Sequence, residues 1–225
     1  MIDILTPTRA RPELCLAMIE SCRSKSPSVR HRLFIDTDDS NALRYGQLLK
    51  GHATILNGNP GRSLGARWNA LAKDAVGPLL MMGNDDLVFD TSGWDEVVHH
   101  RFKKAFPDLI GCLWCDDTIN GPDHCAFPII STRWAHLLGE FTSEAYGFFY
   151  HDTHIMDIAK RIGRTEYVPE VTIRHLYRDV PRDNDPVVTA SRRIGAGDQK
   201  IFDEQESDRI AKAEILREAM ETGRL

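Results

Sequence analysis

Residues 79–89 read Leu-Leu-Met-Met-Gly-Asn-Asp-Asp-Leu-Val-Phe, an apolar run that ends in two adjacent carboxylates, Asp85 and Asp86. The apolar residues after Pro78 have the length of a strand buried on both faces. In an open α/β sheet, such a strand delivers the residues that follow it to the edge where ligands bind. Divalent ions such as Mg²⁺ or Mn²⁺ take oxygen ligands from one or two aspartates and from substrate phosphates. The stretch therefore predicts a metal-diphosphate site. The alternative is a solvated turn that closes a core strand.

The composition is that of one globular domain, with or without a tail. The chain has 225 residues, of which 42% are hydrophobic, enough for a full core. It has no run of eighteen apolar residues and no basic segment at the N-terminus, so we expect neither a membrane span nor a signal peptide. This favours a cytoplasmic protein, in a bacterium or a virus-infected host cell. The formal charge of −5 argues against broad non-specific binding of nucleic acid, but it permits a local basic groove.

The five cysteines are an odd number and are scattered along the chain, which argues against a closed disulfide framework. Cys112, Cys115, His124 and Cys125 could ligate zinc, but a second paired spacing is missing. We therefore expect free thiols in the core, without a metal.

The first third of the chain alternates strands with helices. A strand over 2–6 is followed by the basic loop 7–12, in which Arg9 and Arg11 lie beside the start of a helix and could bind phosphate oxygens. A second strand over 33–35 ends at Asp36, which could accept hydrogen bonds from a base or a ribose. The Gly-rich fingerprint of dinucleotide folds is absent, so a Rossmann dehydrogenase is excluded. A third strand over 53–56 leads to a helix capped by Ser63 that carries Arg67 in its first turns.

The same alternation continues through the rest of the chain and predicts an α/β layer structure with a mainly parallel sheet. Strands are expected over 109–114, 126–130 and 171–173, the last of which ends near His175. The aromatic segment 146–150 precedes Asp152 at the start of a helix, and aromatic side chains beside an acid suit a sugar-binding, catalytic rim. Asp152 could equally be an acid that only favours the helix N-terminus, and His175 could be a strand-end histidine without a metal.

This order of motifs resembles the GT-A fold glycosyltransferases, close to the family 2 type, over about residues 1–177. The resemblance implies one Rossmann-like domain with a mainly parallel central sheet flanked by helices. It implies a nucleotide-binding half over about 1–90 and an acceptor half over about 91–180. A mobile loop and a C-terminal helix over 181–225 would follow.

Carried over by position, the resemblance assigns roles to particular residues. The acid pair corresponds to the family's DXD motif, so that Asp85 would bind the ribose or the metal. Asp152 would be the catalytic base, and Asp86 and His175 would bind Mn²⁺ or Mg²⁺. The nucleotide would be held by Pro7, Thr8, Arg9, Asp36 and Arg67. This sequence departs from the family at Asn84, where many relatives have another Asp, and at His151, where Glu is commoner, so Asp116, Asp117 and Glu144 stay open as alternative bases.

The implied reaction is transfer of a hexosyl or pentosyl group from a nucleoside-diphosphate sugar, with UDP-sugars favoured, to an acceptor hydroxyl with inversion. The acceptor and the oligomeric state stay open: a glycan, a small molecule, a protein or a hydroxymethylated base in DNA would all offer a hydroxyl. A nucleotidyltransferase is one alternative, although its usual Gly-rich, Lys-containing loop after the first strand is absent here. A non-catalytic nucleotide-sugar-binding module is the other.

Overall fold

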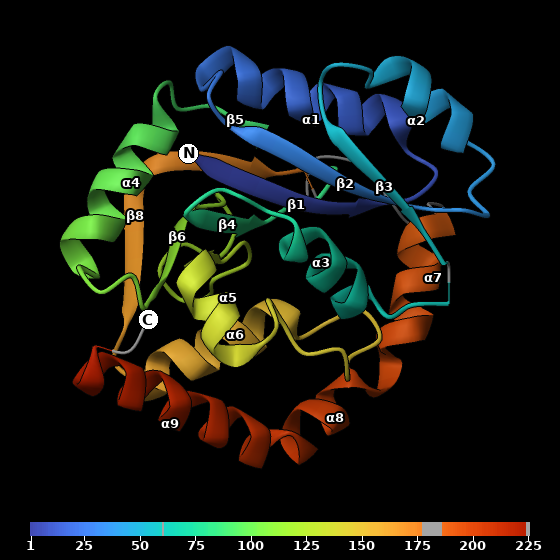
Figure 1. The fold of residues 1–225 in the computed structure, drawn as a ribbon. Coiled ribbons are helices and arrows are strands. Elements are labelled where there is room, and N and C mark those ends of the chain that lie inside the picture. Colours follow the sequence, from blue (N-terminus) through green and yellow to red (C-terminus); the bar gives the residue numbers. More distant parts are fainter. Residues whose placement is uncertain (60, 177–185, 224–225) are drawn as a thin grey trace.

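The computed structural model describes residues 1–59, 61–176 and 186–223. These residues form an α/β structure around one eight-stranded sheet with the strand order β3-β2-β1-β4-β7-β6-β8-β5. Helices cover both faces of the sheet (Figure 1). The expected α/β class and the mainly parallel central sheet are therefore confirmed.

The first half of the sheet is entirely parallel. Its strands are β1 (Ile2–Thr8), β2 (Arg30–Asp36), β3 (Thr54–Gly58) and β4 (Leu79–Met82), in which β1 pairs with both β2 and β4 and β2 pairs with β3. The connecting helices are α1 (Pro12–Lys25), α2 (Ala42–Leu48) and α3 (Leu64–Lys73). Because the strands are parallel, their carboxyl ends lie along one edge of the sheet. That edge positions the candidate site.

The second half of the sheet is mixed. Strand β7 (Ile129–Ser131) runs antiparallel to both β4 and β6 (Cys112–Asp116), whereas β8 (Thr165–His175) runs parallel to β6. The short strand β5 (Leu87–Phe89), which the sequence pattern did not separate from β4, pairs antiparallel with the end of β8. Helices α4 (Trp94–Ala105), α5 (Thr132–Leu138) and α6 (His151–Arg161) complete this half.

The apolar side chains form one cluster on each face of the sheet. Helices α1, α2 and α4 cover one face, with Cys15, Tyr45 and Trp94 buried in the first cluster. Helices α3, α5 and α6 cover the other face, with Trp68 and Trp134 in the second cluster.

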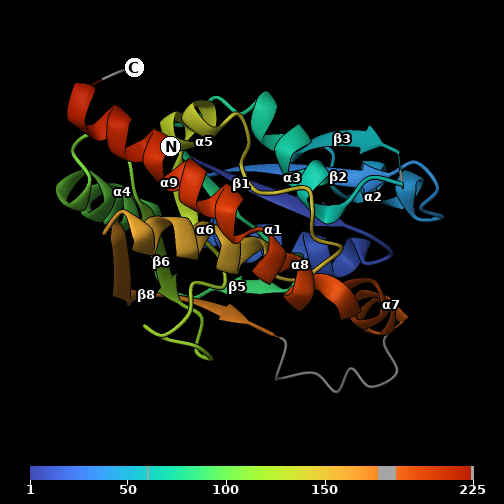
Figure 2. The ribbon, with the colours of Figure 1, turned by 90° about the horizontal axis from the view of Figure 1, so that it is seen from below.

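The C-terminal segment is more helical than its Pro- and Gly-punctuated sequence indicates. It contains α7 (Pro186–Ile194), a 3-10 turn (Gly195–Gly197), α8 (Asp198–Glu204) and α9 (Glu206–Thr222), which follow one another along one side of the molecule (Figure 2). The loop expected over 181–197 is thus helical from Pro186 onward, and residues 181–185 lie outside the described residues. Helix α9 buries Leu216 in the second apolar cluster. None of the helices in the described part of the chain is long and apolar enough to cross a membrane.

Candidate active site

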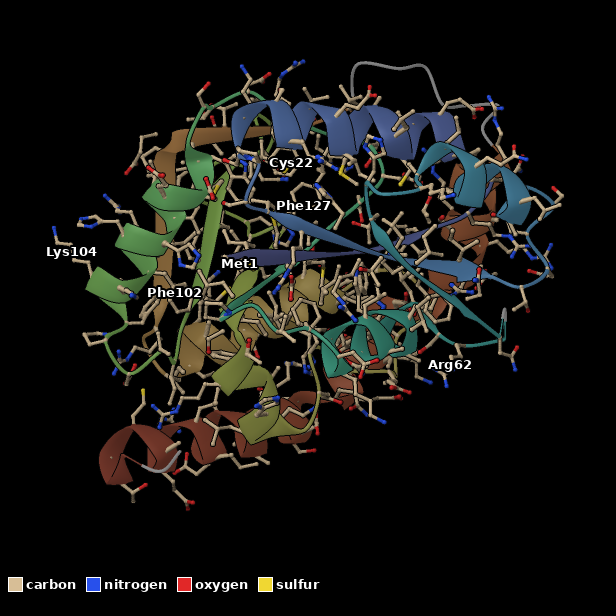
Figure 3. All side chains as sticks on the ribbon, turned by 45° about the horizontal axis from the view of Figure 1, so that its top comes forward. Met1, Cys22, Arg62, Phe102, Lys104 and Phe127 are labelled. Atoms are coloured by element: carbon tan, nitrogen blue, oxygen red, sulfur yellow. The ribbon has the colours of Figure 1, made fainter. Side chains whose placement is uncertain are left out.

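A cavity of about 950 Å³ opens where the carboxyl ends of β1, β2 and β4 meet. Segment 147–152 and helix α7 also line the cavity, and two further lining residues, Arg62 and Phe127, are labelled in Figure 3. Neither Asp116, Asp117 nor Glu144 lines the cavity. Every site residue proposed from the sequence does line it: Pro7, Thr8, Arg9, Asp36, Arg67, Asp85, Asp86, Asp152 and His175. Their chemical roles stay predictions.

Asp85 is tied to the end of β1 by hydrogen bonds. The Thr8 hydroxyl donates to Asp85 Oδ2 over 2.7 Å and lies 2.9 Å from the Tyr45 hydroxyl, while Arg11 Nη1 donates to Asp85 Oδ1 over 3.3 Å. Burial and the neighbouring charge of Asp86 raise the pKa of Asp85 to about 6, against the opposing influence of Arg11 and Thr8. Asp85, predicted to bind the ribose or the metal, is therefore held in place by β1 and by the loop that follows it.

Asp36 binds two arginines, Arg9 and Arg67, at the wall of the cavity. Arg67 donates to both of its carboxylate oxygens, from Nε and Nη2, over 3.0 Å each, and Arg9 Nη1 donates to Oδ2 over 2.9 Å. Arg9 also donates to Asp38, and this bond is the main reason that the pKa of Arg9 is raised. Guanidinium groups keep a planar set of donors that suits phosphate oxygens. Asp36 thus orients the guanidinium groups of Arg9 and Arg67. The sequence predicted only that Asp36 would contact the nucleoside.

Asp86 and His175 meet because β5 pairs with the end of β8. Leu87 lies opposite His175 in the register, and the Leu176 amide donates to the Asp86 carbonyl over 3.0 Å. His175 Nε2 lies 3.4 Å from Asp86 Oδ1, and only 5% of the Asp86 side chain is exposed. The resemblance predicted that these two residues would lie together, although 88 positions of chain separate them.

A carboxylate and an imidazole are suitable ligands for Mn²⁺, but two ligands do not make a closed site. Among the described residues, no group of three His, Cys, Asp or Glu side chains could hold a metal alone. The pair fits an ion that takes its remaining ligands from substrate phosphates and water, as Mg²⁺ and Mn²⁺ do in nucleotide sites.

Asp152 lines the same cavity as the acid pair and lies in the first turn of α6. Its Oδ1 accepts the Thr153 amide over 2.7 Å, and its Oδ2 lies 2.9 Å from His124 Nε2. The hydrogen bond that His124 makes to Asp152 is the largest of the influences that raise the pKa of His124. The sequence singled out His124 only as a possible zinc ligand, and no local signal connects it with a residue 28 positions later.

Residues 147–150, which we call the aromatic wall of the cavity, are joined to the C-terminal segment by hydrogen bonds. The Asp198 carboxylate, 1% exposed, accepts the amides of Gly147, Phe148 and Phe149 over 2.8 Å each. A Cβ on Gly195 would lie 2.2 Å from the Phe149 ring, so only glycine permits this approach. Beside these contacts, the cavity is lined by four residues of α7: Ala190, Ser191, Arg192 and Ile194.

His151, the departure from the family pattern, is buried against Trp68 and Tyr146, whose rings lie 5.1 Å and 5.4 Å from its own. Burial lowers its pKa to about 4, so the imidazole is neutral at pH 7. All five cysteines are buried thiols, and the Cys112 and Cys125 sulfurs are 3.8 Å apart.

Neither the known protein-family models nor the curated proteins match this sequence. Solved structures do match it in fold. The mannosyltransferase PcManGT from Pyrobaculum calidifontis, in complex with GDP-Man and Mn²⁺, aligns with a TM-score of 0.65 and 12% identity over 95% of this chain and 69% of its own.

TarS from S. aureus aligns with a TM-score of 0.60 and 10% identity over 77% of this chain, which spans 36% of the length of TarS. The 1–349 portion of TarS in complex with UDP-GlcNAc aligns with a TM-score of 0.56 and 9% identity, over 77% of this chain and 58% of its own. The chain therefore has the fold of the GT-A-type glycosyltransferases.

Proposed function

We propose that the chain is a metal-dependent glycosyltransferase that moves a sugar from a nucleoside-diphosphate sugar, preferably a UDP-sugar, to an acceptor hydroxyl with inversion. One observation carries the proposal: a single cavity is lined by an arginine cluster and an acid pair at the strand ends and by a separate carboxylate, Asp152, at the start of α6. A donor bound at the strand ends would thus share the cavity with a candidate base.

Each group of cavity residues would have its own role in the reaction. Arg9 and Arg67 would bind donor oxygens, and Asp85 would bind the ribose. Asp86 and His175 would hold Mn²⁺ or Mg²⁺ together with the diphosphate. When bound, that ion stabilises the negative charge that the diphosphate gains as it leaves.

Asp152 would accept the proton of the attacking hydroxyl. General-base catalysis of this kind contributes about 10² to 10⁴ in rate and acts in the transition state, so it adds little to donor affinity. A loss of turnover at unchanged donor affinity would therefore identify an enzyme, because a module that only binds the donor has no turnover to lose.

The test measures release of UDP or GDP from UDP-glucose, UDP-GlcNAc and GDP-mannose with Mn²⁺, using water as the acceptor, alongside donor affinity by calorimetry. Asp152→Asn should lower turnover by roughly 10²-fold or more and change the donor Kd by less than about threefold. Asp123→Asn, which alters an exposed carboxylate outside the cavity, is the matched control and should leave both unchanged. Loss of donor binding in Asp152→Asn would move this residue to the donor site, and unchanged turnover would exclude it as the base.

A further inference from the structure

The pair formed by Asp152 and His124 joins the cavity to the segment between β6 and β7. Asp152 lines the cavity, whereas His124 does not, so the imidazole contacts the carboxylate from outside the cavity lining. The 2.9 Å contact joins His124 Nε2 to Asp152 Oδ2, and the side chains are 33% and 25% exposed. Both side chains are therefore partly accessible to solvent.

The carboxylate of Asp152 is held at both oxygens. Its Oδ1 accepts the amide of Thr153 over 2.7 Å and the Thr153 hydroxyl over 3.2 Å. An ionised carboxylate is only an acceptor, so the imidazole must donate from Nε2. Together these bonds fix one rotamer and leave the remaining lone pairs for an incoming hydroxyl.

The charges around His124 come from one helix, α6, and from the loop after β6. Asp152 on α6 and Asp117 in the loop after β6 favour the imidazolium, while burial and Lys160 on α6 oppose it. The adjacent Cys125 thiol stays neutral because burial raises its pKa. The balance raises the pKa of His124 from its ordinary value of about 6.5.

We propose that His124 is a positioning residue for Asp152 and that its charge controls how strongly this carboxylate accepts a proton. The neutral imidazole orients the carboxylate, and the imidazolium also stabilises its negative charge and so weakens it as a base. The inference rests on the proposed function. In the step concerned, the acceptor oxygen bonds to the anomeric carbon and its proton passes to Asp152. The bond from that carbon to the diphosphate breaks, and its electron pair leaves with the diphosphate.

Turnover should therefore rise with pH as His124 loses its proton. The acid limb of the rate profile would belong to a histidine, and would lie far above the ordinary carboxylate value of about 3.9. Since the two groups interact directly, the limb reports the pair as a unit.

The first experiment needs no turnover. NMR titration of the imidazole Cε1–H signals, with the His124 signal assigned by its loss in His124→Gln, gives the pKa of this residue in the unmodified protein and in Asp152→Asn. We expect the value to fall in Asp152→Asn, because the carboxylate charge is gone. An unchanged value would overturn the pairing.

The second experiment compares the pH dependence of UDP or GDP release in the unmodified protein, in His124→Gln and in the control His136→Gln, which alters an exposed histidine on α5. Glutamine can still donate a hydrogen bond but does not titrate, so the acid limb should move below about pH 5, while His136→Gln keeps it. A limb that stays in place in His124→Gln would overturn the inference. Complete absence of turnover in the unmodified protein would instead contradict the proposed function, and the titration would still decide the pairing.

Discussion

At the scale of single residues, the arginine cluster depends on one buried carboxylate. Only 4% of the Asp36 side chain is exposed, and three guanidinium hydrogen bonds satisfy it. Arg67→Met removes two of the three bonds and leaves the carboxylate with Arg9. Because a buried charge that loses its partner is costly, we expect the free energy of unfolding to fall by about 2 kcal/mol, measured by urea denaturation.

The matched control is Arg44→Met, which breaks the exposed ion pair with Glu13, at 53% and 65% side-chain exposure. Exposed pairs contribute little, so its effect should stay within about 0.5 kcal/mol. Equal losses in Arg67→Met and Arg44→Met would contradict a structural role for Asp36.

At the scale of elements, Asp198 joins the aromatic wall to α7 and α8. Asp198→Asn keeps one carbonyl oxygen but presents an amide group to N–H donors, so at least one of the amides of residues 147–149 loses its acceptor. We expect a loss of about 3 kcal/mol in stability and faster hydrogen exchange at these amides. Asp203→Asn, in the exposed part of the same helix, should change neither quantity. Slow exchange at 147–149 in Asp198→Asn would show that other contacts hold the wall.

The individual strands and helices show how much of the fold could be predicted from the sequence. The parallel strands were predictable because each is a short apolar run next to a helix, and their shared edge brought Thr8, Asp36 and Asp85 together. Strand β5 was missed because it has only three residues, and its pairing with β8 depends on contacts far apart in the chain. Helix α7 was missed because Pro and Gly flank it, although Pro is well tolerated at a helix start. The contact between His124 and Asp152 depends on tertiary packing, which no local sequence pattern indicates.

At the scale of the whole molecule, buried neutral histidines make stability depend on pH. His31 is 2% exposed, and burial, with a smaller effect of Arg23, lowers its pKa to about 4, whereas the unfolded chain has an ordinary value near 6.5. The unfolded state therefore binds more protons between these values, and the contribution to stability is present above about pH 6.5 and lost as the pH falls toward 4.

His31→Leu removes this titration from the core. The drop in unfolding free energy between pH 7 and pH 5 should be smaller than in the unmodified protein by about 2 kcal/mol. The exposed His136→Gln should keep the full drop, and the comparison uses urea denaturation at both values. If His31→Leu keeps it as well, the imidazole of His31 titrates normally in the folded protein.

The most direct test of the central claim is whether the cavity binds a nucleoside diphosphate through a divalent ion at Asp86. Thermal unfolding is followed with UDP, GDP, UDP-GlcNAc and GDP-mannose, each with and without Mn²⁺, in the unmodified protein, in Asp86→Ala and in Asp74→Ala, an exposed control. Ligand at about 100 times its Kd stabilises the folded state by roughly 2.7 kcal/mol, which is readily detected. We predict a Mn²⁺-dependent shift with at least one of these ligands that Asp74→Ala keeps and Asp86→Ala loses. A shift of the same size in Asp86→Ala, or no shift with any of the ligands in the unmodified protein, would contradict the account.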